Sequence, residues 1–310
     1  IDVSLVGSEM CIRDRLNPSL HTKAKGFRQR VAFHVKEIYG VEDVDEITDE
    51  LMEAAKMSEH ASPPAHVKSK WDQSDVMMIT YGDSIKKEGR PPLRELNNFM
   101  VSQLKNTMSG VHILPFNPYS SDDGFSVIDY TTVNPELGSW DDITALGNEF
   151  SVMADLVINH CSRESLWFKN YEKNKAPGRG YFINGLEFED LSQVVRPRST
   201  PLLTEIHAVD GVKQVWCTFG EDQVDLNYRN PDVLLEIVRI IRQYVEQGIH
   251  FFRLDAIAFL WKESGTSCVH LPQTHELIKL LRLVIENLDP SAVIITCLLY
   301  TSDAADEKRC

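Results

Sequence analysis

The chain of 310 residues is 43% hydrophobic and 25% charged, a composition typical of a folded globular protein rather than of a disordered or membrane-embedded one. Its 46 Asp and Glu residues outnumber its 32 Lys and Arg residues, and the formal net charge of −14 would repel a nucleic acid over most of the surface. A small neutral ligand, or an anion captured at one place, suits this charge better.

Both ends of the chain lack a periodic pattern. Residues 1–15 and 297–310 hold three of the six cysteines. They resemble the translated adapter sequence found at the ends of assembled sequencing reads, so we treat both as artefacts and exclude them from the fold.

Residues 16–70 form a predicted N-terminal helical segment. A helix from about Lys23 to Ile38 is indicated by apolar residues that approximate one face, namely Phe27, Val31, Phe33, Val35 and Ile38. A second amphipathic pattern runs from Val44 to Ala55, and Ser62-Pro63-Pro64 is typical of a linker.

The rest of the chain alternates short apolar runs with longer helical patterns. Strands are predicted over 76–81, 111–114 and 152–158 within residues 71–160, and over 250–254 and 293–296 within residues 225–296. Helices are predicted over 93–104, 140–150, 232–246 and 273–287. Residues 161–224 interrupt this order with a polar, aromatic insertion. The alternation predicts an α/β fold in which helices cover a parallel sheet, as a doubly wound sheet or a barrel.

Polar residues gather where the predicted strands end. Asp155–His160 and Phe252–Asp255 each end a strand, Ser120–Phe125 follows another, and Gln223–Asn227 closes the insertion. Because the reactive groups of a barrel lie at the carboxyl ends of its strands, these four clusters are the candidate site.

Three of these segments carry a family resemblance. DLVINH (155–160), QVDLN (223–227) and GIHFFRLDA (248–256) resemble three signature regions of the α-amylase superfamily of glycoside hydrolases, in the expected order. HILPFNPYSSDDGFSVIDY, RPRSTPLLT and AFLWKESGTSCVHLPQTH are similar to the sucrose phosphorylase branch, and most of all to glucosylglycerate phosphorylases. The resemblance runs from about Trp71 to Thr296. It implies the N-terminal half of a (β/α)8 TIM barrel, with a small B-type domain inserted after strand three and helices before the barrel.

The nucleophile is the most specific expectation. A retaining glycosidase needs one carboxylate beneath the anomeric carbon and a protonated carboxyl above it, about 5 Å away. The resemblance makes Asp255 the first of these. Arg253 lies two residues earlier and points to the same side of the strand, so we expect its charge to keep Asp255 ionised. Asp155 is expected to brace the loop. The alternative to a catalytic role for Arg253 and Asp255 is an Arg–Asp pair that only stabilises the end of a strand.

The resemblance also implies five substrate-binding residues. His160 donates to a glucose hydroxyl, Asp122 holds the far hydroxyls, and Phe125 stacks on the sugar ring. Gln223 lies near the acceptor or phosphate, and Arg198 meets phosphate, which suits a planar cation. The alternatives are a structural histidine, a solvated turn and a solvated charge.

The catalytic acid is expected to be missing. Glu263 follows the nucleophile closely, but strand four has ended by then, and the family takes its acid from the end of strand five. There the family pattern continues with a glutamate where Cys297 stands. An eight-stranded barrel needs roughly 250 residues or more, so we expect the remaining strands, and with them activity, to be absent from this chain.

The leading hypothesis is a retaining α-glucoside phosphorylase. Asp255 would form a glucosyl-enzyme, and phosphate would release it as glucose 1-phosphate, with glucosylglycerate as the first choice of substrate and sucrose as the second. One alternative is a hydrolase or transglucosylase on the same barrel, and another is a non-catalytic amylase-like domain that binds sugar or a partner.

No cofactor is expected, and inorganic phosphate is the co-substrate. The cysteines show no Cys-x-x-Cys spacing, so the sequence predicts reduced thiols rather than a zinc or other metal site. No apolar run approaches the roughly 18 residues of a membrane helix, and no secretory leader is recognisable, so we expect a cytoplasmic protein without nucleic-acid or membrane partners. The oligomeric state does not follow from the sequence.

Overall fold

The computed structural model describes residues 26–58 and 71–296. The two terminal stretches interpreted as artefacts, the linker at Ser62-Pro63-Pro64 and the position of Cys297 all lie outside the described residues.

Five parallel strands form the main sheet. They are β1 (Met77–Thr80), β2 (Gly110–Ile113), β3 (Ser151–Val157), β8 (Ile249–Asp255) and β9 (Val293–Thr296), and they lie side by side in that order. A doubly wound sheet reverses its strand order at a switch point, whereas a barrel adds each new strand on the same side. The unreversed order therefore indicates part of a (β/α)8 barrel.

Helices cover the outer side of this sheet. They are α5 (Pro92–Phe99), α6 (Trp140–Gly147), α8 (Pro231–Glu246) and α9 (Pro272–Leu288). Three of them begin with proline, which needs no hydrogen-bond partner at the first helical position. The predicted strands and helices are confirmed to within a few residues. The exception is the helix over 93–104, which ends at Phe99 and continues as a π-helical turn, η1 (Met100–Leu104).

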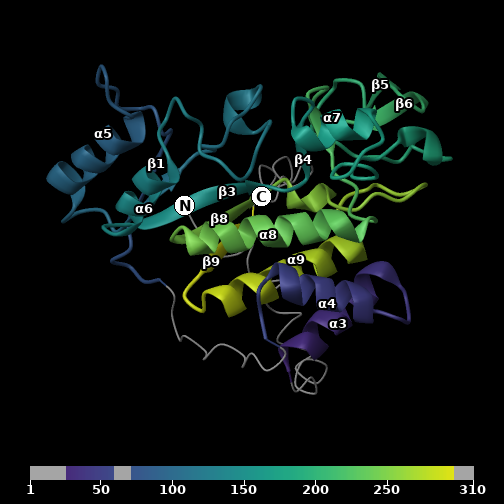
Figure 1. Cartoon of the computed structure of the whole chain (residues 1–310), viewed down its shortest axis with the longest axis horizontal. Coiled ribbons are helices and arrows are strands. Elements are labelled where there is room, and N and C mark those ends of the chain that lie inside the picture. The colour runs from purple at the N-terminus through teal and green to yellow at the C-terminus, as the bar shows by residue number, and fades with distance from the viewer. Residues whose placement is uncertain (1–25, 59–70, 297–310) are drawn as a thin grey trace, which may run out of the picture.

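Two N-terminal helices lie against α8 and α9, below them in Figure 1. They are α3 (Phe27–Tyr39) and α4 (Asp45–Ala54). His34 Nδ1 lies 2.8 Å from Glu276 Oε2 on α9. The prediction that Phe33 belongs to the apolar face was wrong: Phe33 is 40% exposed and His34 only 5%. Counting back from Ile38 by one helical turn reaches His34, so the histidine occupies the buried stripe.

The insertion follows β3 and forms its own small sheets. Strand β4 (His160–Ser162) pairs antiparallel with β7 (Gln223–Asp225), and β5 (Leu203–Ala208) forms a hairpin with β6 (Gly211–Trp216). Between β4 and β5, the chain forms α7 (Leu166–Glu172) and the short helix η3 (Gly185–Glu187). These elements gather at one end of the main sheet in Figure 1. The domain boundaries stated from the sequence stay a prediction.

Two short 3-10 turns complete the frame. One is η2 (Asp122–Gly124) in the loop after β2, and the other is η4 (Ile257–Phe259) directly after β8. None of the helices in the described ranges combines the length and apolar composition needed to cross a membrane.

Candidate active site

The site is built on two adjacent strands, β3 and β8. Their parallel register pairs Asp155 with Arg253 and Val157 with Asp255. Asp255 is the last residue of β8, and its side chain is 15% exposed. The carboxyl ends of both strands therefore bring their charged side chains to the same edge of the sheet.

Arg253 bridges two carboxylates. Its Nη1 donates to Asp155 Oδ1 and lies 3.1 Å from Asp255 Oδ1. Asp155 has a fully buried side chain, and its other oxygen lies 2.7 Å from His112 Nε2 on β2. Asp155 thus holds the guanidinium in place across the strands, rather than bracing a loop as we expected.

Burial sets the titration of Asp255. Loss of contact with water raises the pKa of Asp255 above its ordinary value, while the charge of Arg253 lowers it in part and the charge of Asp155 adds to the rise. The sequence indicated the nearby positive charge, but it did not indicate the burial that outweighs it. The carboxylate is therefore poorly solvated, which favours nucleophilic reactivity once it is ionised.

His160 begins β4 and is almost fully buried. Its Nε2 lies 3.1 Å from the Phe125 carbonyl oxygen, and its Nδ1 lies 3.3 Å from Asn159 Nδ2. Burial lowers the pKa of His160, so the neutral ring is favoured. The donor that we predicted for a sugar hydroxyl is occupied here by a backbone carbonyl.

The loop after β2 carries the next two predicted residues. Asp122 has a left-handed backbone at φ 55°, and Gly124 has φ 106°, a conformation that favours glycine. This backbone places Asp122 Oδ2 2.9 Å from Gln223 Nε2 on β7. The Arg253 guanidinium lies 5.8 Å from the centre of the Phe125 ring. Six of the seven predicted site residues are thus connected; they are Asp122, Phe125, His160, Gln223, Arg253 and Asp255.

Arg198 stands apart from these six. It is exposed in the long loop before β5, and its carbonyl accepts a 2.9 Å hydrogen bond from Arg196 Nε. Arg196 also donates to Thr200 Oγ1 at 2.7 Å. Within the described ranges, Arg196 shapes the loop, and no contact joins the Arg198 side chain to the other predicted residues.

A carboxylate that the sequence did not single out fastens the loop after β2. Asp222 Oδ2 accepts hydrogen bonds from Ser120 at 2.5 Å, Ser121 at 2.5 Å and Ser126 at 2.8 Å. Burial raises the pKa of Asp222, but these hydrogen bonds outweigh it and the pKa is lowered overall. The loop and the insertion are therefore held together at this point.

A buried lysine also escaped the sequence analysis. Lys262 Nζ lies 2.6 Å from Asp225 Oδ2 and 3.1 Å from Asn159 Oδ1, and it donates to the Phe259 carbonyl as well. The side chains of Lys262 and Asp225 are 1% and 0% exposed. Seven residues beyond Asp255, a lysine resembles an ordinary solvated charge, so no local pattern revealed it. Its neighbour Glu263 is exposed.

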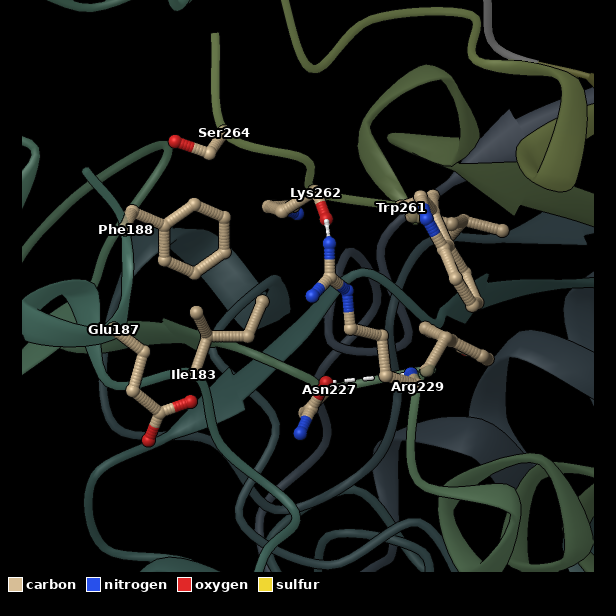
Figure 2. Close-up of a pocket in the computed structure, with 10 residues that line it drawn as sticks. Ile183, Glu187, Phe188, Asn227, Arg229, Trp261, Lys262 and Ser264 are labelled. Atoms are coloured by element: carbon tan, nitrogen blue, oxygen red, sulfur yellow. Dashed lines mark hydrogen bonds between the residues drawn. The ribbon is translucent and has the colours of Figure 1, made fainter. Parts of the chain in front are cut away.

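A small pocket is lined in part by the segment that carries Lys262 (Figure 2). Arg229 crosses it, donating from Nη2 to the Lys262 carbonyl at 2.7 Å, with Phe188 and Trp261 on either side at 5.6 and 5.8 Å. None of the seven predicted site residues lines this pocket. No group of three or more potential metal ligands occurs in the parts of the chain that the structure describes.

Comparison with known proteins identifies the family. The model for the alpha amylase catalytic domain matches residues 104–307. The chain is 51% identical over 225 residues to a glucosylglycerate phosphorylase of Spirochaeta thermophila, covering 73% of this chain and 38% of that protein. It is 44% identical over 269 residues to the one from Allomeiothermus silvanus, covering 87% and 48%. The chain thus spans less than half the length of these curated relatives.

A solved structure agrees in fold. The sucrose 6F-phosphate phosphorylase from Thermoanaerobacter thermosaccharolyticum superposes with a TM-score of 0.66 and 26% identity, over 76% of this chain and 50% of that one. The family match, the five parallel strands and this superposition confirm the predicted fold class as part of a (β/α)8 barrel. The chain belongs to the α-amylase catalytic-domain family.

Proposed function

We propose that this chain carries the nucleophile half of a retaining α-glucoside phosphorylase, with Asp255 as the nucleophile. The observation that carries the proposal is the position of Asp255, at the end of β8, 3.1 Å from the guanidinium of Arg253. The two glucosylglycerate phosphorylases that are 51% and 44% identical support the reaction class and make glucosylglycerate the first substrate to test. Sucrose is the second.

The reaction proceeds in two displacements at one carbon. Asp255 attacks the anomeric carbon, the bond to the glyceric acid oxygen breaks, and a proton from a second carboxyl group goes to that oxygen. Phosphate then attacks the same carbon, the ester to Asp255 breaks, and glucose 1-phosphate leaves. Arg253 holds Asp255 in place and stabilises its charge when the carboxylate is released.

The binding residues act around this carbon. His160 donates from Nε2 to a glucose hydroxyl once the sugar displaces the Phe125 carbonyl. Asp122 accepts from the far hydroxyls, and Phe125 packs on the ring. Gln223 lies beside both His160 and Asp122 and faces the acceptor or phosphate. Arg198 reaches phosphate only if its loop moves toward the site.

The second carboxyl group belongs at the end of β9, directly after Thr296. This position lies outside the described residues. That the 310-residue chain has no catalytic activity by itself stays a prediction. The test therefore uses two proteins: the chain itself, and a fusion in which the corresponding second half of the Allomeiothermus silvanus relative follows Thr296.

Each protein is incubated with glucosylglycerate, with and without inorganic phosphate, and glucose 1-phosphate is measured. We expect phosphate-dependent product from the fusion only. The control is Asp255→Asn in the fusion, which should lower turnover by about 10⁴-fold or more because an amide is a poor nucleophile. Glucose released without phosphate would identify a hydrolase, and full activity of Asp255→Asn would remove Asp255 as the nucleophile.

A further inference from the structure

The Asn159 side chain lies between two buried charges and His160. Its Oδ1 is 3.1 Å from Lys262 Nζ, and its Nδ2 is 3.0 Å from Asp225 Oδ2 and 3.3 Å from His160 Nδ1. All four side chains are buried. An amide at this position therefore connects the ion pair directly to the histidine ring.

The charges allow only one orientation of this amide. An ammonium can only donate, so the amide oxygen must face Lys262. An ionised carboxylate can only accept, so the amide NH2 must face Asp225. Rotating the amide by half a turn would place donor against donor and acceptor against acceptor, among side chains that are all buried. The orientation follows from the chemistry of the neighbours and not from the placement of two similar atoms.

The oriented amide selects the tautomer of His160. Because the Asn159 NH2 faces Nδ1, this nitrogen must keep its lone pair, and the hydrogen of the neutral ring must be on Nε2. The Phe125 carbonyl, 3.1 Å from Nε2, requires the same tautomer. Gln223 Nε2 also approaches Nε2, at 3.3 Å. It donates to Asp122 at 2.9 Å, so this one contact does not outweigh the two that agree.

We propose that Lys262 is a positioning residue for His160: through Asn159 it holds the ring hydrogen on Nε2. The Phe125 carbonyl also favours this tautomer, but it occupies the nitrogen that a sugar would use. Once a hydroxyl displaces that carbonyl, only the contact at Nδ1 remains to fix the donor. The backbone of Lys262 is itself held in place, because its carbonyl accepts a hydrogen bond from the Arg229 guanidinium (Figure 2).

The inference deepens the proposed function, because it assigns a reason for His160 to act as a donor, but its test needs no turnover. Two-bond proton–nitrogen correlations of the nitrogen-15-labelled chain at neutral pH show which ring nitrogen carries hydrogen. A His160→Gln spectrum identifies the signals of His160. We expect the wild-type ring to carry its hydrogen on Nε2 alone.

Two variants break the connection from Lys262 through Asn159 to His160, here called the relay, at different points. Asn159→Leu deletes the amide and leaves the ion pair, and Lys262→Met/Asp225→Asn deletes both charges together so that no buried charge is left alone. In both variants the Phe125 carbonyl stays in place and the approach of Gln223 Nε2 opposes it, so we expect loss of the Nδ1 contact alone to raise the share of the Nδ1–H form several-fold. Gln223→Leu is the matched control, because it removes an amide at the same 3.3 Å distance from the other ring nitrogen and should leave the tautomer unchanged.

An unchanged Nε2–H ring in either variant overturns the proposal. If the double variant does not fold, Asn159→Leu decides: a wild-type spectrum there refutes the relay. These results are independent of the phosphorolysis assay. A fixed tautomer in a chain whose fusion makes no glucose 1-phosphate would leave this inference standing and remove the proposed function, and a mobile tautomer in an active fusion would do the reverse.

Discussion

Removing the ammonium of Lys262 is expected to destabilise the chain strongly. Lys262 and Asp225 lie 2.6 Å apart with side chains 1% and 0% exposed, so Lys262→Met leaves a carboxylate in the interior without its counter-charge. Breaking a buried pair in this way costs about 3–5 kcal/mol. Asp225 keeps hydrogen bonds from Thr218 and Asn159, and for this reason we expect the lower value, about 3 kcal/mol.

Urea-induced unfolding, followed by circular dichroism, measures this loss as a change in the free energy of unfolding. The control is Lys105→Met, because Lys105 lies 2.5 Å from Glu149 in an equally short pair whose side chains are 54% and 35% exposed. That exposed pair is worth about 1 kcal/mol or less. Adding Asp225→Asn to Lys262→Met should restore at least half of the lost stability. Equal losses for Lys262→Met and Lys105→Met would refute the reasoning from burial.

Three further predictions concern titration and packing. Folding raises the pKa of Asp255, so above the ordinary value of 3.8 the ionised carboxylate opposes folding. Asp255→Asn should therefore raise the free energy of unfolding at pH 7, and this gain in stability should disappear in acid. Urea unfolding at several pH values measures it. Burial raises the pKa of Glu276, but the hydrogen bond with His34 helps lower it to about 2, so its contribution is present above the ordinary value of 4.5. Glu276→Gln should therefore lower the melting temperature at pH 7, with the difference shrinking between pH 4.5 and about 2. Phe27→Ala should cost about 3–5 kcal/mol and Phe33→Ala about 0.5 kcal/mol or less in urea unfolding, and similar costs would contradict the observed helix face.

The strands and helices of the barrel could be predicted because their signals are local. β3 and α8 each carry an apolar pattern with the period of their own structure, and the polar residues that follow mark where they end. The face of α3 was predicted less well. A histidine occupies the buried stripe because Glu276, 242 positions away, accepts its hydrogen bond, and no local pattern contains that partner.

The site residues likewise divide into those that could be predicted from the sequence and those that could not. The family resemblance predicted Asp255, the alternation of side chains along one strand placed Arg253 on the same side, and the structure connects the two. Lys262 could not be found, because its burial depends on Asn159 and Asp225, which come from two other segments. Arg198 was predicted from the family resemblance, but the side chain that forms contacts in this loop is that of Arg196.

The packing of α3 on α9 has a consequence for the newly made protein. His34 leaves the ribosome 242 positions before its partner Glu276, and at about 5–20 residues per second this separation corresponds to a delay of roughly 12–50 seconds. During this delay α4 is available to pack against α3 but α9 is not, so the apolar side chains of α3, among them Val31, Val35 and Ile38, lack part of their final cover. Until α9 emerges, the nascent chain therefore exposes the apolar face of α3 that packs on α9, and we expect chaperones that hold such segments to bind it.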